Sequence, residues 1–343
     1  MSTFWLAVLI IAIALVFDYI NGFHDAANSI ATIVATRVLT PFQAVLWAAF
    51  FNFAAAFVVG TAVANTVGKG FVDLQLVTPY VILAGLAGAI AWDLMTWWLG
   101  LPTSSSHALI GGYAGAAMAR VALMRGISHS FEALNFGTGG QWPRTLKFIV
   151  LAPLIGMVSA YLLMMLVYWL FRHSSPAKMD QYFRKLQLLS AALFSLSHGS
   201  NDAQKTAGII AGVLYTSGYQ KTFTIPAWVL MAAYSAIALG TMSGGWRIVR
   251  TMGGRLTRLK PRSGFCAETG AASAVLISTY LGQPVSTTHA IAGAIAGVGS
   301  IQRTKAVRWG IATNIMWAWV ITIPLSAAIA WMCFLLLHIA ARV

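Results

Sequence analysis

Long apolar stretches alternate with short polar ones along most of the chain. The apolar runs cover residues 4–17 continuing into 19–36, then 42–64, 148–171, 226–246 and 310–338. A helix of about 20 apolar residues crosses the roughly 30 Å hydrocarbon core of a bilayer. The pattern therefore predicts an all-α polytopic membrane protein. The opening residues "MSTFWLAVLIIAIALVFDYI" lack a basic start and a small-residue cleavage site, which favours a retained helix over a secretory signal.

The charges change this picture little. Charged residues make up 9% of the 343 residues and the net charge is +14, but the basic residues lie between apolar runs, which indicates topology more than nucleic-acid binding. The positive-inside rule places the basic loops 172–185 and 247–262 in the cytoplasm and both termini outside a plasma or inner membrane. Cys266 and Cys333 are isolated and predict neither a disulfide nor a metal framework.

The two halves of the chain resemble each other. "NGFHDAANSIAT" (21–32) matches "SHGSNDAQKTAG" (197–208), so that Asp25 corresponds to Asp202 at a shift of 177 residues. "LGLPTSSSHALIGGYAG" (99–115) matches "LGQPVSTTHAIAGAIAG" (281–297) at a shift of 182, and "PLIGMVSAYLL" (153–163) matches "PLSAAIAWMCF" (324–334). Three landmarks in one order indicate a duplication.

The basic loops and the duplication together predict two repeats of inverted topology. The first repeat spans 1–171 with a re-entrant hairpin at about 79–119, 172–185 forms a basic linker, and the second repeat spans 186–343 with a hairpin at about 265–300. The hairpin tips are expected near 100–102 and 282–284, where Gly and Pro break the helices. Inverted repeats with broken helices are typical of secondary transporters, and no Walker-type motif for ATP is present.

Asp25 and Asp202 are carboxylates inside apolar segments, where an uncompensated charge costs several kcal/mol. Amide side chains flank both of them, at Asn21, Asn28, Asn201 and Gln204. Carboxylate and amide oxygens without thiolates suit a hard cation such as Na⁺. A structural polar network between helices is the alternative interpretation. The repetition of the aspartate at matching positions favours a cation site.

Hydroxyl residues follow the proline at each predicted tip. We call these two clusters the serine-threonine knots, and they comprise Thr103, Ser104, Ser105 and Ser106 in the first repeat and Ser286, Thr287 and Thr288 in the second. Proline followed by Ser or Thr starts helices, and a helix N-terminus binds anions through its free N–H groups. The knots therefore predict a site for a small oxyanion. The alternative is that the hydroxyls merely cap helix ends inside the membrane.

Other polar residues border the knots. His107 and His289 follow them at matching positions and are secondary candidates for binding the anion or orienting a hydroxyl. Lys205 is the one intramembrane lysine, so we assign it, with Gln204, to the anion site, although a local ion pair with Asp202 is the simpler alternative. Asp93 and Glu268 are weaker candidates for further polar sites.

These motifs resemble the inorganic phosphate transporter family of secondary carriers. "GFHDAANSIAT" and "GSNDAQKTAG" are similar to its paired signature, and "LPTSSSHALIGG" and "QPVSTTHAIAG" to its two hairpin motifs. The resemblance covers nearly the whole chain. It implies a non-enzymatic phosphate symporter without a cofactor, in which the signature aspartates serve the cation and the hairpin hydroxyls hold phosphate.

Two departures widen the choice of cargo and coupling ion. His24 stands where the second signature has Asn201, whereas sodium-coupled relatives commonly carry Asn-Asp in both copies. A titratable group there admits H⁺ as well as Na⁺, and a metal-phosphate complex as cargo. The chain also lacks a long hydrophilic central domain. A sulfate permease, an anion channel or a structural scaffold are the alternatives, and the chain is expected to act alone or as a homodimer.

Overall fold

The computed structural model describes residues 2–58, 60–137, 140–302 and 307–341, and nearly all of them are helical. The longer helices are α1 (Thr3–Ala35), α2 (Pro41–Ala54), α3 (Ala62–Gly70), α4 (Pro79–Leu99), α5 (Ser105–Arg125), α6 (Gln141–Leu170), α7 (Pro176–Thr216), α8 (Ala227–Ser243), α10 (Pro261–Tyr280), α11 (Thr287–Gln302) and α12 (Trp309–Ala341). Shorter turns include α9 (Trp246–Arg250) and the π-helical η4 (Thr251–Arg255). Among the described residues, four helices are long and apolar enough to cross a membrane, or up to six if each bent helix pair is one span. The expected all-α membrane protein is confirmed.

Two expected segments are built differently from the sequence expectation. Residues 42–64 do not form one straight crossing, because Pro41–Phe57 and Ala62–Gly70 meet at 84°. The basic segment 172–185 is mostly helical: Ser175 caps α7 by accepting a hydrogen bond from the Lys178 amide, and Pro176 occupies the first turn. Proline is pre-organised for that position, so the helix starts early.

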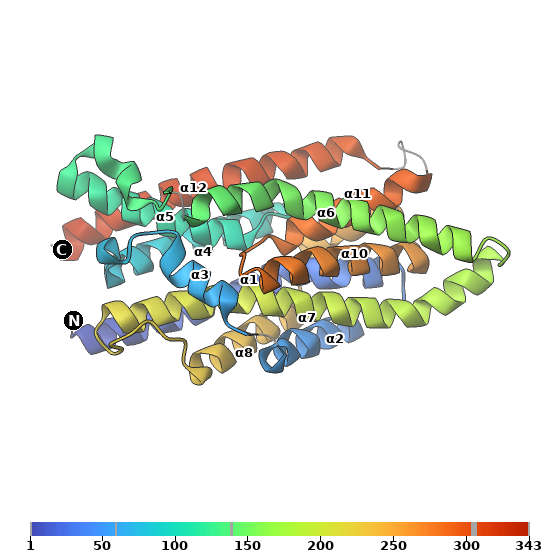
Figure 1. Ribbon diagram of the computed structural model, residues 1–343, viewed down its shortest axis with the longest axis horizontal. Coiled ribbons are helices and arrows are strands. Elements are labelled where there is room, and N and C mark those ends of the chain that lie inside the picture. Colours follow the sequence, from blue (N-terminus) through green and yellow to red (C-terminus); the bar gives the residue numbers. More distant parts are fainter. Residues whose placement is uncertain (1, 59, 138–139, 303–306, 342–343) are drawn as a thin grey trace.

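Two helix pairs form hairpins. α4 ends at Gly100 (φ +66°) and α10 turns at Gly282 (φ +68°), a left-handed conformation that favours glycine. The first hairpin is longer than expected and extends to Arg125. Figure 1 shows α4 and α5 in one half of the bundle and α10 and α11 in the other, with the breaks of both pairs near mid-length. The start of α1 and the end of α12 lie at the same end of the bundle (Figure 1).

Each hairpin packs against an outer helix of the opposite half of the chain. α5 contacts α12, and α11 contacts α6. Glycines permit the close approach: a Cβ added to Gly115 would lie 2.1 Å from the Ala327 carbonyl oxygen, and one at Gly293 would lie 2.2 Å from that of Pro153. Small residues at such contacts let helix backbones approach inside a membrane.

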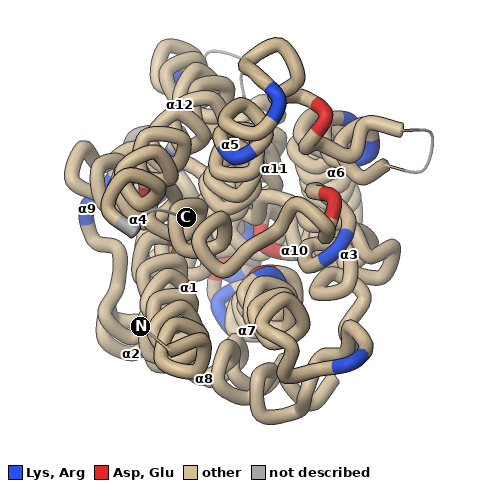
Figure 2. The backbone as a smooth tube through the Cα atoms, turned by 90° about the vertical axis from the view of Figure 1, so that its left-hand side faces the viewer, with Lys and Arg blue, Asp and Glu red and all other residues tan. Residues whose placement is uncertain are grey.

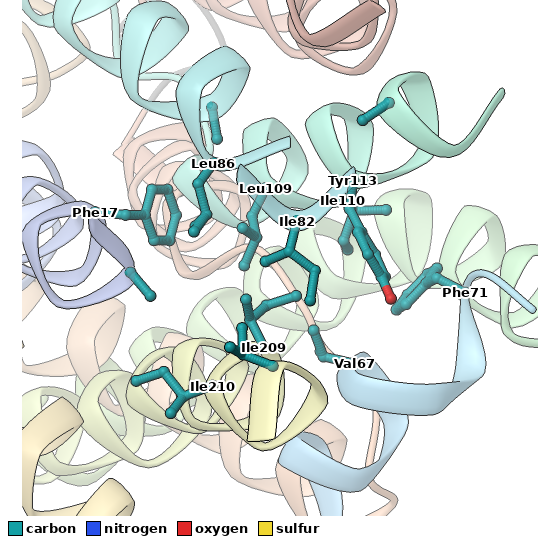
Figure 3. Close-up of a cluster of buried hydrophobic side chains, with 14 of the residues drawn as sticks. Phe17, Val67, Phe71, Ile82, Leu86, Leu109, Ile110, Tyr113, Ile209 and Ile210 are labelled. Carbon is teal, nitrogen blue, oxygen red and sulfur yellow. The ribbon is translucent and has the colours of Figure 1, made fainter. Parts of the chain in front are cut away.

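A hydrophobic cluster packs the first hairpin against α1, α3 and α7. Figure 3 shows Ile82 and Leu86 of α4 and Leu109 and Tyr113 of α5 among side chains of α1, α3 and α7. The same α7 segment continues into the second signature, with Ile209 packed in the cluster. The cluster therefore positions α7 against the first hairpin.

Candidate functional site

Acidic side chains gather in the interior of the bundle. Of the eight acidic residues in the chain, five are buried to 2% exposure or less: Asp18, Asp25, Asp93, Asp202 and Glu268. Figure 2 shows acidic segments in the middle of the bundle among α1, α7 and α10, while most basic segments lie further out. A buried carboxylate inside a membrane needs a cation, a proton or hydrogen-bond donors.

The two knots begin α5 and α11 and touch each other. Ser104 accepts a hydrogen bond from the His107 amide at 3.3 Å, and Ser286 accepts one from the His289 amide at 3.2 Å. The helices thus start after the prolines, which lie in the preceding loops. The Thr288 hydroxyl donates to the carbonyl oxygen of Thr103 at 3.0 Å. Two helix N-termini from opposite halves therefore converge on one point.

Asn28 of the first signature reaches the second knot. Its side-chain amide donates to the hydroxyl oxygens of Thr287 at 3.3 Å and Thr288 at 2.9 Å. Asn28 is buried, as are both threonines. A side chain expected to bind the cation thus holds the knot expected to bind the anion.

Lys205 of the second signature reaches the first knot in the corresponding way. Its ammonium donates to the Ser106 hydroxyl, to the Asp202 carboxylate at 2.6 Å and to the Val285 carbonyl oxygen at 2.8 Å. Lys205 is 1% exposed, so the ion pair is shielded from water. Lys205 thus makes both the local pair with Asp202 and a contact with a hydroxyl of the first knot.

Asp25 is bound by His24 and by the first knot. The Nδ1 atom of His24 lies 2.7 Å from an Asp25 oxygen, and Nε2 lies 3.1 Å from the Thr96 hydroxyl. The Ser105 hydroxyl donates to the same Asp25 oxygen at 3.4 Å. Thr96 of α4 is a further neighbour of this pair, which the repeated motifs do not mark.

The remaining predicted amides have other contacts. Asn201 braces the second tip: it donates to the Gln283 carbonyl oxygen at 3.1 Å and accepts from the Val285 amide at 3.1 Å. The Gln204 carbonyl oxygen accepts from the amides at the start of α3, Val63 at 3.0 Å and Ala64 at 3.3 Å. Gln204 therefore caps α3 instead of facing the knots. The carbonyl oxygen of Asn21 makes no hydrogen bond to the described residues.

His198, which the sequence motifs did not point to, lies beside both signature aspartates. Ligand atoms of Asp25, His198 and Asp202 lie within 4.8 Å of one another, and all three residues are buried. The shift of 177 residues that aligns the aspartates also aligns His198 with Asn21, which is the signal that would have found it. The cluster offers two carboxylates and an imidazole to a cation.

A chain of hydrogen bonds fixes the tautomer of His198. The Thr241 hydroxyl donates to the Ile237 carbonyl oxygen at 2.9 Å, so its oxygen accepts from the Asn52 amide at 2.8 Å. The Asn52 carbonyl oxygen then accepts from Nδ1 of His198 at 3.2 Å. Nε2 faces an Asp202 oxygen at 3.4 Å. In neutral His198 both facing atoms carry lone pairs, and a cation or a proton between them resolves the repulsion.

His107 and His289 pack together behind the knots. Their ring centroids are 4.7 Å apart at 74°, and the His289 ring stacks on Trp319 at 3.8 Å and 25°. Glu268 lies elsewhere: Thr32, Gln187 and Ser190 donate to it. Glu268 therefore belongs to a separate buried polar cluster.

The chain matches a known protein family. Residues 21–330 match the family model described as "Phosphate transporter family". The chain belongs to this family. Members of the family are transporters and not enzymes, which agrees with a site built from binding groups at two helix N-termini. The resemblance seen in the signature and hairpin motifs is thereby confirmed.

Relatives that match nearly the whole chain are named as transporters of the same kind. The chain is 53% identical over 335 residues to a "Probable low-affinity inorganic phosphate transporter" of Rhizobium meliloti (96% of both chains) and 42% identical to one of Bacillus subtilis (97% of both). Its fold matches a structure titled "The sodium-dependent phosphate transporter" with a TM-score of 0.86 at 24% identity, over 97% of this chain and 99% of the other. That likeness confirms the fold.

Proposed function

We propose that this family member imports inorganic phosphate across the cell membrane by symport with Na⁺ or H⁺. The main support for this proposal is that side chains of each signature form hydrogen bonds with the knot of the other half. Asn28 holds the second knot and Lys205 holds the first, so the cation and anion groups form one site. A cation bound at the aspartates then strengthens anion binding at the knots through its charge, which is the basis of symport.

Phosphate is favoured over sulfate by the donor set and the relatives. The relatives are named for inorganic phosphate. Hydroxyls of the knots both donate and accept hydrogen bonds, so they suit an oxyanion that still carries a proton. A channel has no use for the buried Asp25–His24 and Asp202–Lys205 pairs, which favours a carrier.

The coupling ion is proposed to bind between the signature aspartates. Asp202 Oδ2 and His198 Nε2 make no hydrogen bond to the described residues although both are buried. A bound cation or a proton satisfies them together. The fold neighbour titled as sodium-dependent supports Na⁺, and the His24–Asp25 pair at 2.7 Å supports H⁺.

The orientation proposed places both termini outside and loops 172–185 and 247–262 in the cytoplasm. The shared end of α1 and α12 in the bundle supports a common side for the termini (Figure 1). The positive-inside bias of the loops supports its direction.

Uptake of radiolabelled phosphate into proteoliposomes tests the proposal. An imposed inward Na⁺ or H⁺ gradient is expected to drive accumulation that excess sulfate leaves unchanged. Uptake that ignores both gradients would refute symport. Uptake that sulfate suppresses at equimolar concentration would refute the choice of phosphate. Asp25→Asn in parallel vesicles reports leak, because it removes a proposed coupling carboxylate without changing side-chain size.

A metal-phosphate complex is a second candidate cargo. The imidazole of His198 beside Asp25 and Asp202 is a ligand set that suits a divalent ion such as Mn²⁺ or Zn²⁺ better than Na⁺. If the cargo is such a complex, phosphate uptake depends on divalent ions and His198→Ala lowers that dependence. Uptake unaffected by a chelator would exclude this cargo.

A further inference from the structure

An apolar hollow lies on the outside of the bundle, separate from the polar site. It has a volume of about 630 Å³ and lies between α6 and α12. Pro153 of α6 and Pro324 of α12, the matching prolines of the two halves, both line it, and Ala292 and Gly293 of α11 form part of its wall. Figure 2, which views the bundle along its length, shows α6 and α12 on either side of α11.

The walls of the hollow fit hydrocarbon. All of its lining residues are apolar, and several are widely exposed, including Val150 (58%) and Val320 (63%). Apolar hollows of this kind do not hold ordered water because they offer no polar partners. Both flanking helices are among those long enough to cross the membrane. The walls of the hollow therefore suit a flexible hydrocarbon chain from the bilayer.

The charges beside one end of the hollow fit an anionic headgroup. Trp309 and Leu256 line that end, and the amide of Arg308 donates to the Leu256 carbonyl oxygen at 3.0 Å. Arg308 is exposed, and so is Arg258, two residues beyond Leu256. Basic residues beside a hollow between transmembrane helices are typical of sites for anionic lipid headgroups.

Trp319 connects the hollow to the hairpin tips. Its side chain lines the hollow, its ring stacks on His289 at 3.8 Å, and its Nε1–H donates to the Pro102 carbonyl oxygen at 3.0 Å. Pro102 directly precedes the first knot, and His289 directly follows the second. One indole thus contacts both tips from the side that faces the lipid.

We propose that this hollow binds one acyl chain of an anionic phospholipid, and that the chain steadies both hairpin tips through Trp319. Filling the hollow fixes Trp319 against His289 and Pro102, which keeps the two knots in their converging arrangement. Lipid binding is independent of the transport reaction. The effect on phosphate affinity rests on the proposed function.

Lipid binding in the hollow is tested with the full-length protein in a neutral detergent and without phosphate. Native mass spectrometry measures retention of added phosphatidylglycerol against phosphatidylcholine. Ala312 lines the hollow on α12, so Ala312→Phe fills it; Ala328 lies on the same helix, exposed and outside the hollow, so Ala328→Phe is the matched control. Ala312→Phe is expected to lower phosphatidylglycerol retention about tenfold, Ala328→Phe to leave it unchanged, and Arg258→Gln with Arg308→Gln to remove the preference over phosphatidylcholine.

Equal retention by wild type and a folded, monodisperse Ala312→Phe would overturn the site. If Ala312→Phe instead dissociates a dimer while keeping its lipid, the hollow belongs to a second copy of the chain and the proposal is equally overturned. Both results are independent of whether phosphate is carried.

The proposed effect of the lipid on phosphate affinity is tested by measuring phosphate binding in nanodiscs with and without phosphatidylglycerol. Wild type is expected to bind phosphate severalfold more tightly with the anionic lipid. Trp319→Phe keeps an aromatic wall and the stacking partner but loses the hydrogen bond to Pro102. It is expected to retain lipid and lose the lipid dependence of phosphate affinity. A wild-type affinity that ignores the lipid would overturn the coupling.

Discussion

The two signature helices carry an aspartate at matching positions but neutralise it differently. On α7, Asp202 pairs with Lys205 at 2.6 Å, a cation that is built into the helix. On α1, the position that corresponds to Lys205 is Asn28, and Asp25 pairs instead with His24 at 2.7 Å. Histidine gains and loses its proton near neutral pH, whereas lysine ordinarily stays charged.

The two halves therefore place different groups beside their aspartates. The Lys205 ammonium balances Asp202 and also touches the first knot, so it supplies a fixed positive charge near the proposed anion. Asp25 pairs with the titratable side chain of His24 and accepts a hydrogen bond from Ser105. The two matching positions therefore differ in the group that balances the aspartate, a lysine on α7 and a histidine on α1.

Removing either signature carboxylate is expected to have the largest effect on transport. Asp25→Asn and Asp202→Asn are each expected to lower gradient-driven uptake about a hundredfold, because each removes about 3 kcal/mol of charge interaction, while the protein still inserts. Uptake per molecule in proteoliposomes is the measurement. Wild-type rates in both variants would return the aspartates to a structural role.

Lys205→Met separates stability from transport. It leaves Asp202 buried without its cation, and breaking such a pair costs about 3–5 kcal/mol. The double variant Asp202→Asn with Lys205→Met removes both charges and is expected to recover most of the lost thermal stability in detergent, but no uptake. A double variant as unstable as the single one would show that the pair contributes little to folding.

His24→Asn makes the first signature like the second at this position. It is expected to lower H⁺-driven uptake about tenfold, the equivalent of one hydrogen bond to a charged group, and to spare Na⁺-driven uptake. The measurement compares the two gradients in the same vesicles. Unchanged H⁺-driven uptake would exclude His24 from coupling.

Ser105→Ala tests the first knot. The Ser105 hydroxyl lies 3.4 Å from Asp25, and its loss is expected to raise the apparent KM for phosphate about fivefold, the value of one hydrogen bond of about 1 kcal/mol. Ser273→Ala on α10 is the control, because that hydroxyl donates to the carbonyl oxygen of Thr269 in its own helix. Equal KM values for the two variants would argue against the knot.

The smallest effect is expected outside the membrane. His129 and Arg125 hold the pKa of exposed Glu132 below its usual range, through hydrogen bonds and charge. A carboxyl whose pKa is depressed on folding stabilises the protein above its unfolded pKa, and this contribution is lost as the pH falls through the folded value. Glu132→Gln should thus leave uptake at pH 7 unchanged and alter stability only slightly, as seen in thermal melts between pH 7 and pH 3.

Much of this architecture could be predicted from the sequence, because apolar length, Gly-Pro breaks and repeated motifs are local signals. They identified the membrane class, both hairpins, the knots and the signature aspartates. The contact of Gln204 with the start of α3 could not be predicted, because a side chain that caps another helix is a tertiary contact. The environment of His198 could not be predicted either, since it depends on Asn52 and Thr241 of distant helices.

The most direct test of the central claim, that cation and phosphate share one site, is phosphate binding to the purified protein measured against Na⁺ and H⁺ concentration. One shared site predicts reciprocal coupling: one of these cations tightens phosphate binding at least about tenfold, and phosphate tightens binding of that cation by the same factor. Asp25→Asn should abolish both effects. Phosphate affinity in the wild-type protein that is independent of both cations would contradict the account.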